Sequence, residues 1–318
     1  MSVLSGDSVE DLFPTHGAIE ERQQIGRSDA IAALAARIRD HGDSLLLEPR
    51  KEGKSSVAGA AMARIAAEGG IVTEVDCTSA GIGSGESMAR AVLQSVRAQD
   101  RHVSRALEAR NAAAKRRDWL AKLRRGTSAA EAVGVGEAGA LGRALDVLPD
   151  PDGVTLDDVL DALTRLGEAE TVALFLDEVQ AVARWADGDE VQRALARFMR
   201  RKGRRVAVVV AGSDRSATEA LFAPGKPLHW EFEPFPLPPI DRLDWHRGLV
   251  ERFALAGHEL AAGLVDVMLD ATGGHPQRTM AVAKQTLREA RAAEASEVSW
   301  GAVDAAITIA RRHPSWST

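Results

Sequence analysis

Residues 48–56 have the types and spacing of a loop that binds phosphate. They read EPRKEGKSS and match the pattern GxxxxGK[ST], with Glu48 where the pattern begins with glycine. A loop that enters a helix N-terminus points backbone N–H groups at an anion, and the helix dipole adds to the attraction. We expect Lys54 to reach the β and γ phosphates of a nucleotide and the Ser55 hydroxyl to bind Mg²⁺. The candidate nucleotide-binding residues of this loop are Pro49, Arg50, Lys51, Glu52, Gly53, Lys54, Ser55 and Ser56.

Two carboxylates follow directly on an uninterrupted apolar run. Residues 171–176 read TVALFL, as expected for a central parallel strand buried on both faces, and Asp177 and Glu178 come next. The carboxyl ends of parallel strands are where such sheets bind ligands. We expect Asp177 to hold Mg²⁺ through water and Glu178 to orient and activate an attacking water. The alternative is a strand end followed by a helix cap, a position that also favours aspartate.

A serine ends a third apolar strand. Residues 206–211 read VAVVVA and lead into Gly212 and Ser213. If this strand lies beside residues 171–176, we expect Ser213 to contact the γ phosphate or the attacking water. An ordinary turn serine is the alternative.

The elements predicted around these motifs alternate between strand and helix, which is typical of a parallel sheet with crossover helices. A cluster of prolines between 224 and 239 marks the best domain boundary, and residues 241–312 are helical in pattern throughout. The predicted strands are 44–48, 71–76, 171–176 and 205–212. The predicted helices of the first part are 30–39, 55–68, 87–123, 155–167 and 189–202.

The motifs, in this order, resemble those of the AAA+ branch of P-loop ATPases, and more narrowly the archaeal-type and STAND-like group. The resemblance covers residues from about 24 to 290. It implies an α/β fold, with a P-loop NTPase parallel-sheet core of the AAA+ and ASCE type and a C-terminal α-helical lid domain. The segments that carry it are 25–29 (IGRSD), 48–56 (EPRKEGKSS), 176–178 (LDE), 212–213 (GS) and 273–276 (GGHP).

The same resemblance implies a division of the chain and roles for further residues. Ile25 and Gly26 would line the adenine pocket, and Ser213 would be the first sensor. Arg278, just after GGHP, would be the second sensor, reaching the phosphates from the lid; a solvated helix arginine is the alternative. The implied parts are an N-terminal arm (1–24), a P-loop ATPase core (25–236) with a helical insertion at about 81–150, and a helical lid (237–318).

The sequence departs from this family pattern in two places. Glu48 weakens binding by repulsion if its side chain faces the phosphates, whereas little changes if it turns outward. The family usually has Gly-Arg after the Pro-Leu that precedes the lid, but residues 227–231 read PLHWE. Arg215 and Lys226 are the nearest basic candidates for an arginine finger.

Charge and composition limit the partners. The chain has 318 residues and a net charge of −6, so a globally basic nucleic-acid binder is excluded. Two basic islands, 97–125 and 191–205, each carry a local charge of +7, which suits either a DNA path or solvated faces of amphipathic helices. A single cysteine and the lack of an apolar leader or membrane span predict a cytoplasmic protein without membrane contact.

The sequence therefore predicts an ATP hydrolase that acts as a nucleotide-dependent molecular switch, through Mg-ATP binding and slow hydrolysis. A protein partner or self-assembly is implied by such a switch, but neither is identifiable from the residues. One alternative is a DNA-binding AAA+ regulator of the transposition or replication type. The other is a scaffold that binds nucleotide without turnover, and Glu48 in place of the first glycine of the loop pattern would indicate this loss of activity.

Overall fold

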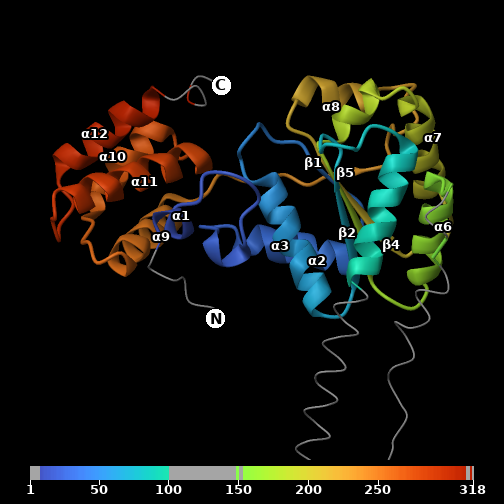
Figure 1. Cartoon of the computed structure of the whole chain (residues 1–318), viewed down its shortest axis with the longest axis horizontal. Coiled ribbons are helices and arrows are strands. Elements are labelled where there is room, and N and C mark those ends of the chain that lie inside the picture. The colour runs from blue at the N-terminus through green and yellow to red at the C-terminus, as the bar shows by residue number, and fades with distance from the viewer. Residues whose placement is uncertain (1–7, 100–147, 150–152, 313–315, 317–318) are drawn as a thin grey trace, which may run out of the picture.

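The computed structural model describes residues 8–99, 148–149, 153–312 and 316. In Figure 1 a sheet with its flanking helices lies to the right, and a group of helices from the end of the chain lies to the left. No described helix is long and apolar enough to cross a membrane.

Five parallel strands form one sheet in the order β2-β3-β4-β1-β5. Strands β1 and β3 lie on either side of β4, because Leu45 of β1 and Leu176 of β3 each pair with Val210 of β4. The carboxyl ends of these three strands therefore lie side by side at one edge of the sheet. The strands are β1 (Ser44–Leu46), β2 (Ile71–Asp76), β3 (Val172–Asp177), β4 (Val206–Ala211) and β5 (Glu233–Pro234).

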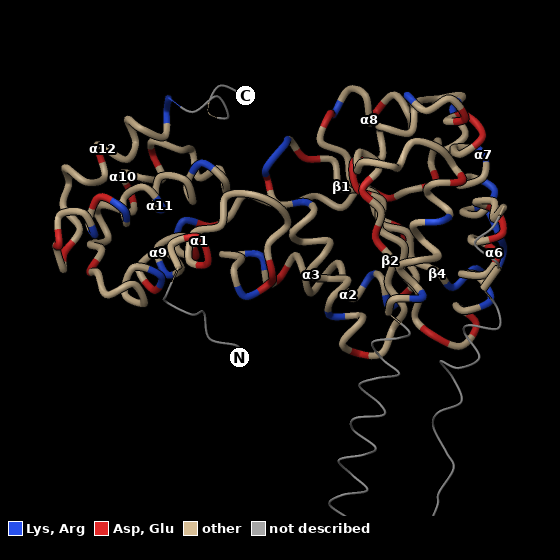
Figure 2. Tube along the Cα trace, in the orientation of Figure 1, with Lys and Arg blue, Asp and Glu red and all other residues tan. Residues whose placement is uncertain are grey.

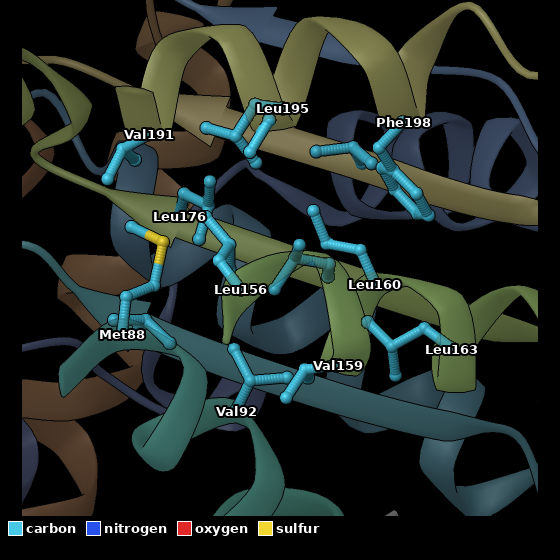
Figure 3. Packing of buried hydrophobic residues seen from close by; sticks show 14 of the residues in the cluster. Met88, Val92, Leu156, Val159, Leu160, Leu163, Leu176, Val191, Leu195 and Phe198 are labelled. Carbon is cyan, nitrogen blue, oxygen red and sulfur yellow. The ribbon is translucent and has the colours of Figure 1, made fainter. Parts of the chain in front are cut away.

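Helices cover both faces of the sheet, as the uninterrupted apolar strands require. Along β4, Ala207, Val209 and Ala211 pack toward α2 (Ser28–Arg39) and α3 (Lys54–Ala67). Val206, Val208 and Val210 pack toward the opposite layer. That layer holds the helix at 85–99, α6 (Leu156–Leu166) and α7 (Gly188–Met199), and Figure 3 shows their apolar side chains meeting Leu176.

The C-terminal part is a bundle of four helices with its own apolar core around Trp245 and Phe253. The four helices differ at their N-termini, because the side chains of Asp241 and Ser299 accept backbone N–H groups whereas Ala261 has no side-chain cap. They are α9 (Arg242–Leu255), α10 (Ala262–Thr272), α11 (Pro276–Ala292) and α12 (Trp300–Arg311).

The segment 8–24 packs more closely than its polar, weakly periodic sequence suggests. It contains α1 (Val9–Leu12) and the short 3-10 helix η1 (Glu21–Gln23). Leu12 and Phe13 are fully buried in the core of the C-terminal bundle. Burial of these two apolar side chains, together with hydrogen bonds from Arg252, anchors a segment whose average composition predicts an arm.

Other boundaries differ only slightly from the prediction. The first strand ends at Leu46 because Leu47 and Glu48 already belong to the loop, and α3 begins one residue earlier than expected. Within the expected insertion at 81–150, residues 85–99 are helical, while residues 100–147 and the glycine-rich stretch 126–142 lie outside the described residues. The two remaining elements are η2 (Val179–Arg184), directly after β3, and α8 (Arg215–Leu221), after β4.

Candidate nucleotide-binding site

The loop between β1 and α3 has the backbone shape of an anion-binding loop. Lys51 and Gly53 adopt the left-handed conformation, with φ of +70° and +93°. A Cβ at Gly53 would meet no atom within 4 Å, so glycine is favoured here by its backbone angle rather than by space. The loop leads directly into the N-terminus of the 14-residue helix α3, whose first N–H groups lack helical partners.

Lys54 lies folded back onto its own loop. Its Nζ donates hydrogen bonds to the backbone oxygens of Glu48 (2.6 Å) and Pro49 (2.8 Å). Burial lowers the pKa of Lys54, and the nearby carboxylates, first Glu178 and then Asp177, act in the opposite direction. The Lys54 ammonium group is therefore bound by two backbone oxygen atoms, which phosphate oxygens could replace.

The Glu48 side chain points away from the helix N-terminus. Its Oε1 accepts the backbone N–H of Leu237 at 3.3 Å, on the segment that leads to the C-terminal bundle. Of the two orientations left open by the sequence, the structure shows the outward one. The carboxylate still lies close enough to oppose, as a lesser cause, the lowering of the pKa of Lys54 and of Arg27 by burial.

Asp177 and Ser55 meet at the carboxyl edge of the sheet. The Ser55 hydroxyl donates to Asp177 Oδ2 at 2.5 Å, and Asp177 Oδ1 accepts the N–H of Glu178 at 2.9 Å. Burial raises the pKa of Asp177, and these two hydrogen bonds oppose the rise. A hydroxyl and a carboxylate that lie next to each other are oxygen ligands of the kind that Mg²⁺ prefers, so Ser55 and Asp177 fit that ion.

Glu178 is held from two sides. It has a left-handed backbone, with φ of +50°. Its Oε2 accepts the Ser213 hydroxyl at 2.7 Å and the side-chain amide of Gln180. Arg50 Nε in turn donates to Ser213 Oγ at 3.3 Å, so the phosphate loop, β3 and β4 are joined in one hydrogen-bond chain. Thr218, which is fully buried, lies beside this chain, with its Oγ1 at 3.4 Å from Gln180 Oε1.

Ile25 and Gly26 pack against the start of the C-terminal bundle. Ile25 is buried in the bundle core, where it lies so close to Gly248 that a Cβ there would come within 2.7 Å of its side chain. A Cβ at Gly26 would come within 2.6 Å of Ile240. Their role in binding adenine stays a prediction.

Arg27 joins three segments of the site. Its guanidinium donates to the backbone oxygens of Glu52 (3.0 Å) in the phosphate loop and Pro238 (2.5 Å) before α9. Burial lowers the pKa of Arg27, and the carboxylates of Glu52 and Glu48 oppose this shift. The arginine therefore fixes the spacing between the loop and the connection to the bundle.

His275 is the residue of the GGHP segment that touches the phosphate loop. Its Nε2 lies 3.6 Å from Glu52 Oε1, and its Nδ1 accepts the N–H of Arg278 at 3.4 Å. Burial lowers the pKa of His275, and Glu52 opposes the shift. The guanidinium of Arg278 lies 5.8 Å from the ring centre of Trp316, and its buried Nε has no partner among the described residues.

The structure brings most of the predicted residues together and adds four. Lys54, Ser55, Asp177, Glu178 and Ser213 converge at one edge of the sheet, whereas Arg278 makes no recorded contact with the loop. The additional residues are polar or charged side chains that occur within or beside motifs already noted. Their proximity to these motifs in the sequence is the signal that could have identified them as site residues. They are Arg27, Gln180, Thr218 and His275.

The comparisons with known proteins agree with this geometry. The family model described as AAA ATPase domain matches residues 23–210. No curated protein sequence matches the chain. Among solved structures, a Walker-type ATPase of Pyrococcus abyssi is similar over 94% of this chain and 76% of its own, with 15% identity and a TM-score of 0.63.

Two structures from Aeropyrum pernix have the same fold. The ORC2 protein in its ADPNP–ADP complexes is similar over 95% of this chain and 71% of its own, with 15% identity and a TM-score of 0.60. The ORC1 protein in complex with DNA is similar over 96% and 70%, with 14% identity and a TM-score of 0.56.

A parallel sheet with a phosphate loop after β1 and paired carboxylates at the end of β3 defines a P-loop nucleotide hydrolase. The family match extends over more than half of the chain, and the chain belongs to the AAA ATPase domain family. The α/β core with a C-terminal helical lid and the assignment as an ATP hydrolase are thereby confirmed. The narrower archaeal-type and STAND-like grouping stays a prediction.

Proposed function

We propose that the chain is an ATP-dependent molecular switch, in which Mg-ATP closes the helical lid on the core and slow hydrolysis reopens it. The observation that carries the proposal is the contact between the lid and the phosphate loop, where His275 lies 3.6 Å from Glu52. A ligand shifts a conformational equilibrium only by binding one state better. A nucleotide held by the loop at 48–56 and touched by the lid would have that preference.

In this proposal the phosphate loop binds the nucleotide through charge. Lys54 exchanges the carbonyls of Glu48 and Pro49 for the β and γ phosphates, because a charged acceptor forms the stronger hydrogen bond. Ser55 and Asp177 would hold Mg²⁺, Asp177 through water, and the ion would neutralise charge that develops on the phosphates. Ile25 and Gly26 contact the adenine.

In this proposal the carboxylate that promotes hydrolysis is that of Glu178, at the end of β3. Glu178 takes the proton of the attacking water, and Ser213 orients the carboxylate or the γ phosphate through the hydroxyl that now lies 2.7 Å from Glu178. Arg278 serves as the second sensor from the lid, for which its unpartnered Nε is available within the described part of the chain.

Calorimetry and phosphate release test the binding and turnover steps. Wild type, Lys54→Ala and Glu178→Gln are titrated with ATP and Mg²⁺, and phosphate release is measured for all three. We expect Lys54→Ala to lose binding and Glu178→Gln to keep binding and lose turnover. Binding by wild type without turnover would favour a nucleotide-locked scaffold, and lack of binding would refute the switch.

Lid motion needs its own measurement. The chain has a single cysteine, Cys77, which is buried, so a pair of exposed labelling sites can be introduced cleanly. Glu219→Cys on α8 and Leu243→Cys on α9 place one fluorophore on the core and one on the lid. We expect energy transfer to change with Mg-ATP and to stay unchanged in the Lys54→Ala background.

A DNA-binding AAA+ regulator is the second candidate function. The observation that favours it is a groove lined by cationic side chains on α7, within the basic island 191–205. Binding of this kind weakens steeply as salt rises. If ATP also controls it, duplex DNA should bind the Mg-ATP form of wild type more tightly than Lys54→Ala; equal, salt-independent or undetectable binding would remove this candidate.

A further inference from the structure

A cationic groove of about 480 Å³ lies between α7 and the loop that follows α8. Its charged and polar lining consists of Arg193, Arg197, Arg200, Lys226 and His229, and no described Asp or Glu lines it. None of these residues belongs to the phosphate loop. The groove is therefore a second potential anion-binding surface, separate from the nucleotide site.

The three arginines share the outer face of one helix. The opposite face of α7 is buried, with Leu195 and Phe198 packed toward α6 (Figure 3), so the arginines project outward. Their spacing of i, i+4 and i+7 places one guanidinium per helical turn over roughly 10 Å. Figure 2 shows basic positions (blue) and acidic positions (red) close together in the region of α6 and α7. A row of evenly spaced cations suits a polymer with repeated negative charges better than a single carboxylate.

Only part of the groove's positive charge is neutralised within the chain. Arg197 pairs with Asp157, and Arg200 pairs with Glu231, each at 2.6 Å. No ion pair is recorded for Arg193 or for Lys226 among the described residues. The groove thus keeps free cations at both of its walls, one on the helix and one on the loop.

Trp230 directly follows His229, the last groove-lining residue of the loop, and 87% of its surface is exposed. Its φ of +64° is strained for a bulky residue, and such strain persists only where the surroundings impose it. The neighbouring residues do so, because Leu228 is buried and His229 Nδ1 lies 2.7 Å from the carbonyl oxygen of Phe222. The His229 ring lies 4.8 Å from the Trp230 ring and is tilted by 56° to it, so the indole remains open to solvent.

We propose that this groove binds single-stranded nucleic acid, an inference that rests on the DNA-binding candidate function above and narrows it to single strands, with phosphates on the arginines and Lys226 and one unstacked base on Trp230. Proteins that hold single strands combine a positive groove with aromatic side chains, because the backbone supplies charge and every unpaired base has an open π-face. A duplex offers the same phosphates but hides its base faces. An acidic peptide or a second copy of this chain would use the cations without needing an exposed base platform.

Fluorescence anisotropy with a labelled oligothymidylate of about 20 nucleotides tests the proposal on the full chain. Affinity is measured from about 50 to 200 mM salt, and the matching duplex is measured in parallel. We expect the single strand to bind more tightly than the duplex. Each of Arg193→Ala and Lys226→Ala should lower the slope of log K against log salt by roughly 0.7 if it removes one phosphate contact.

Trp230→Ala separates stacking from charge. It should weaken binding by roughly 5- to 150-fold, the range for loss of one base stack, and leave the salt slope unchanged. Arg247→Ala and Trp300→Ala are matched controls, because both residues are exposed on the lid, and both variants should bind as wild type does. All these side chains are exposed, so the variants should keep the wild-type melting temperature.

Three results would overturn the proposal. The first is absence of binding at low salt, and the second is equal affinity for duplex and single strand with no effect of Trp230→Ala. The third is self-association that the oligonucleotide does not compete with and that Lys226→Ala abolishes, which would assign the groove to a second copy of the chain. Each result leaves the ATP switch untouched, because ATP titrations report on Lys54 and Glu178 independently.

Discussion

Gly212 is the position where one added methyl group should separate catalysis from nucleotide binding. A Cβ built there would lie 2.1 Å from Thr218 Oγ1 and 2.9 Å from Thr218 Cβ. Thr218 is fully buried and donates to the backbone oxygen of Asp214 at 2.6 Å, so it has little room to move. Gly212→Ala must therefore push β4 and α8 apart by about 1.3 Å to reach ordinary contact.

The cost of that displacement follows from packing. Extra methyl groups in a filled core cost about 1–3 kcal/mol, and the rigid partner places Gly212→Ala toward the upper end. For a domain of this size that is roughly 4–10 °C in melting temperature. Ser213 follows directly in the chain, and its 2.7 Å hydrogen bond to Glu178 would not survive a shift of this size. A misplacement of about 1 Å at a reacting group costs on the order of 100-fold in turnover.

The assay compares Gly212→Ala with Gly59→Ala, a matched control on α3. A Cβ at Gly59 meets no atom within 4 Å, so alanine there should stabilise the helix by roughly 0.5–1 kcal/mol. Melting temperature, ATP affinity by calorimetry and phosphate release are measured for both. Gly212→Ala should lose turnover and stability while keeping ATP affinity within about twofold. Equal melting temperatures and equal turnover in the two variants would refute the reasoning.

A second substitution checks that Thr218 is the obstacle. Thr218→Ala removes two of the three atoms that the new methyl group would meet. Residues in contact show coupling, so Gly212→Ala should cost less in the Thr218→Ala background than in wild type. An identical cost in both backgrounds would place the strain elsewhere.

Three further predictions concern the lid, the loop and the metal. Arg252→Ala leaves two backbone oxygens of the segment 8–24 without partners and should lower the free energy of unfolding by about 2–4 kcal/mol, as followed by tryptophan fluorescence in urea. Glu48→Gln keeps an oxygen for the Leu237 N–H and removes a charge that points away from the helix N-terminus, so ATP affinity in calorimetry should stay within about twofold of wild type. Because burial raises the pKa of Asp177, protonation should weaken Mg²⁺-dependent ATP binding at a higher pH than for an ordinary aspartate, and Asp177→Asn should remove this pH dependence.

The sequence predicted the elements that pattern and local chemistry determine. Residues 172–176 and 206–211 are apolar throughout, as expected for strands covered on both faces, and both form central strands. The carboxyl edge of these strands then brought Ser55, Asp177 and Ser213 together. These positions follow from strand order and need no knowledge of side-chain packing.

The contacts that sequence reasoning missed depend on tertiary packing over long separations. Arg27 reaches Pro238 across 211 residues, and Arg252 reaches Leu12 across 240 residues. Neither partner is a side chain, so no pairing of charges in the sequence could reveal them. Trp230 was equally hidden, because exposure and a left-handed φ are properties of the folded loop alone.

The segment 8–24 gives the lid a second connection to the phosphate loop. Ser56, in the first turn of α3, accepts the N–H of Ile19 at 3.2 Å, and its backbone oxygen accepts the amide of Gln24 at 2.8 Å. The far side of the segment is held by Arg252 on α9. The lid is thus joined to the phosphate loop and the start of α3 both through His275 and through residues 8–24. In the proposed switch, a nucleotide bound at the phosphate loop would act on the lid through both connections, and each connection has two ends that a double-mutant cycle can test for coupling.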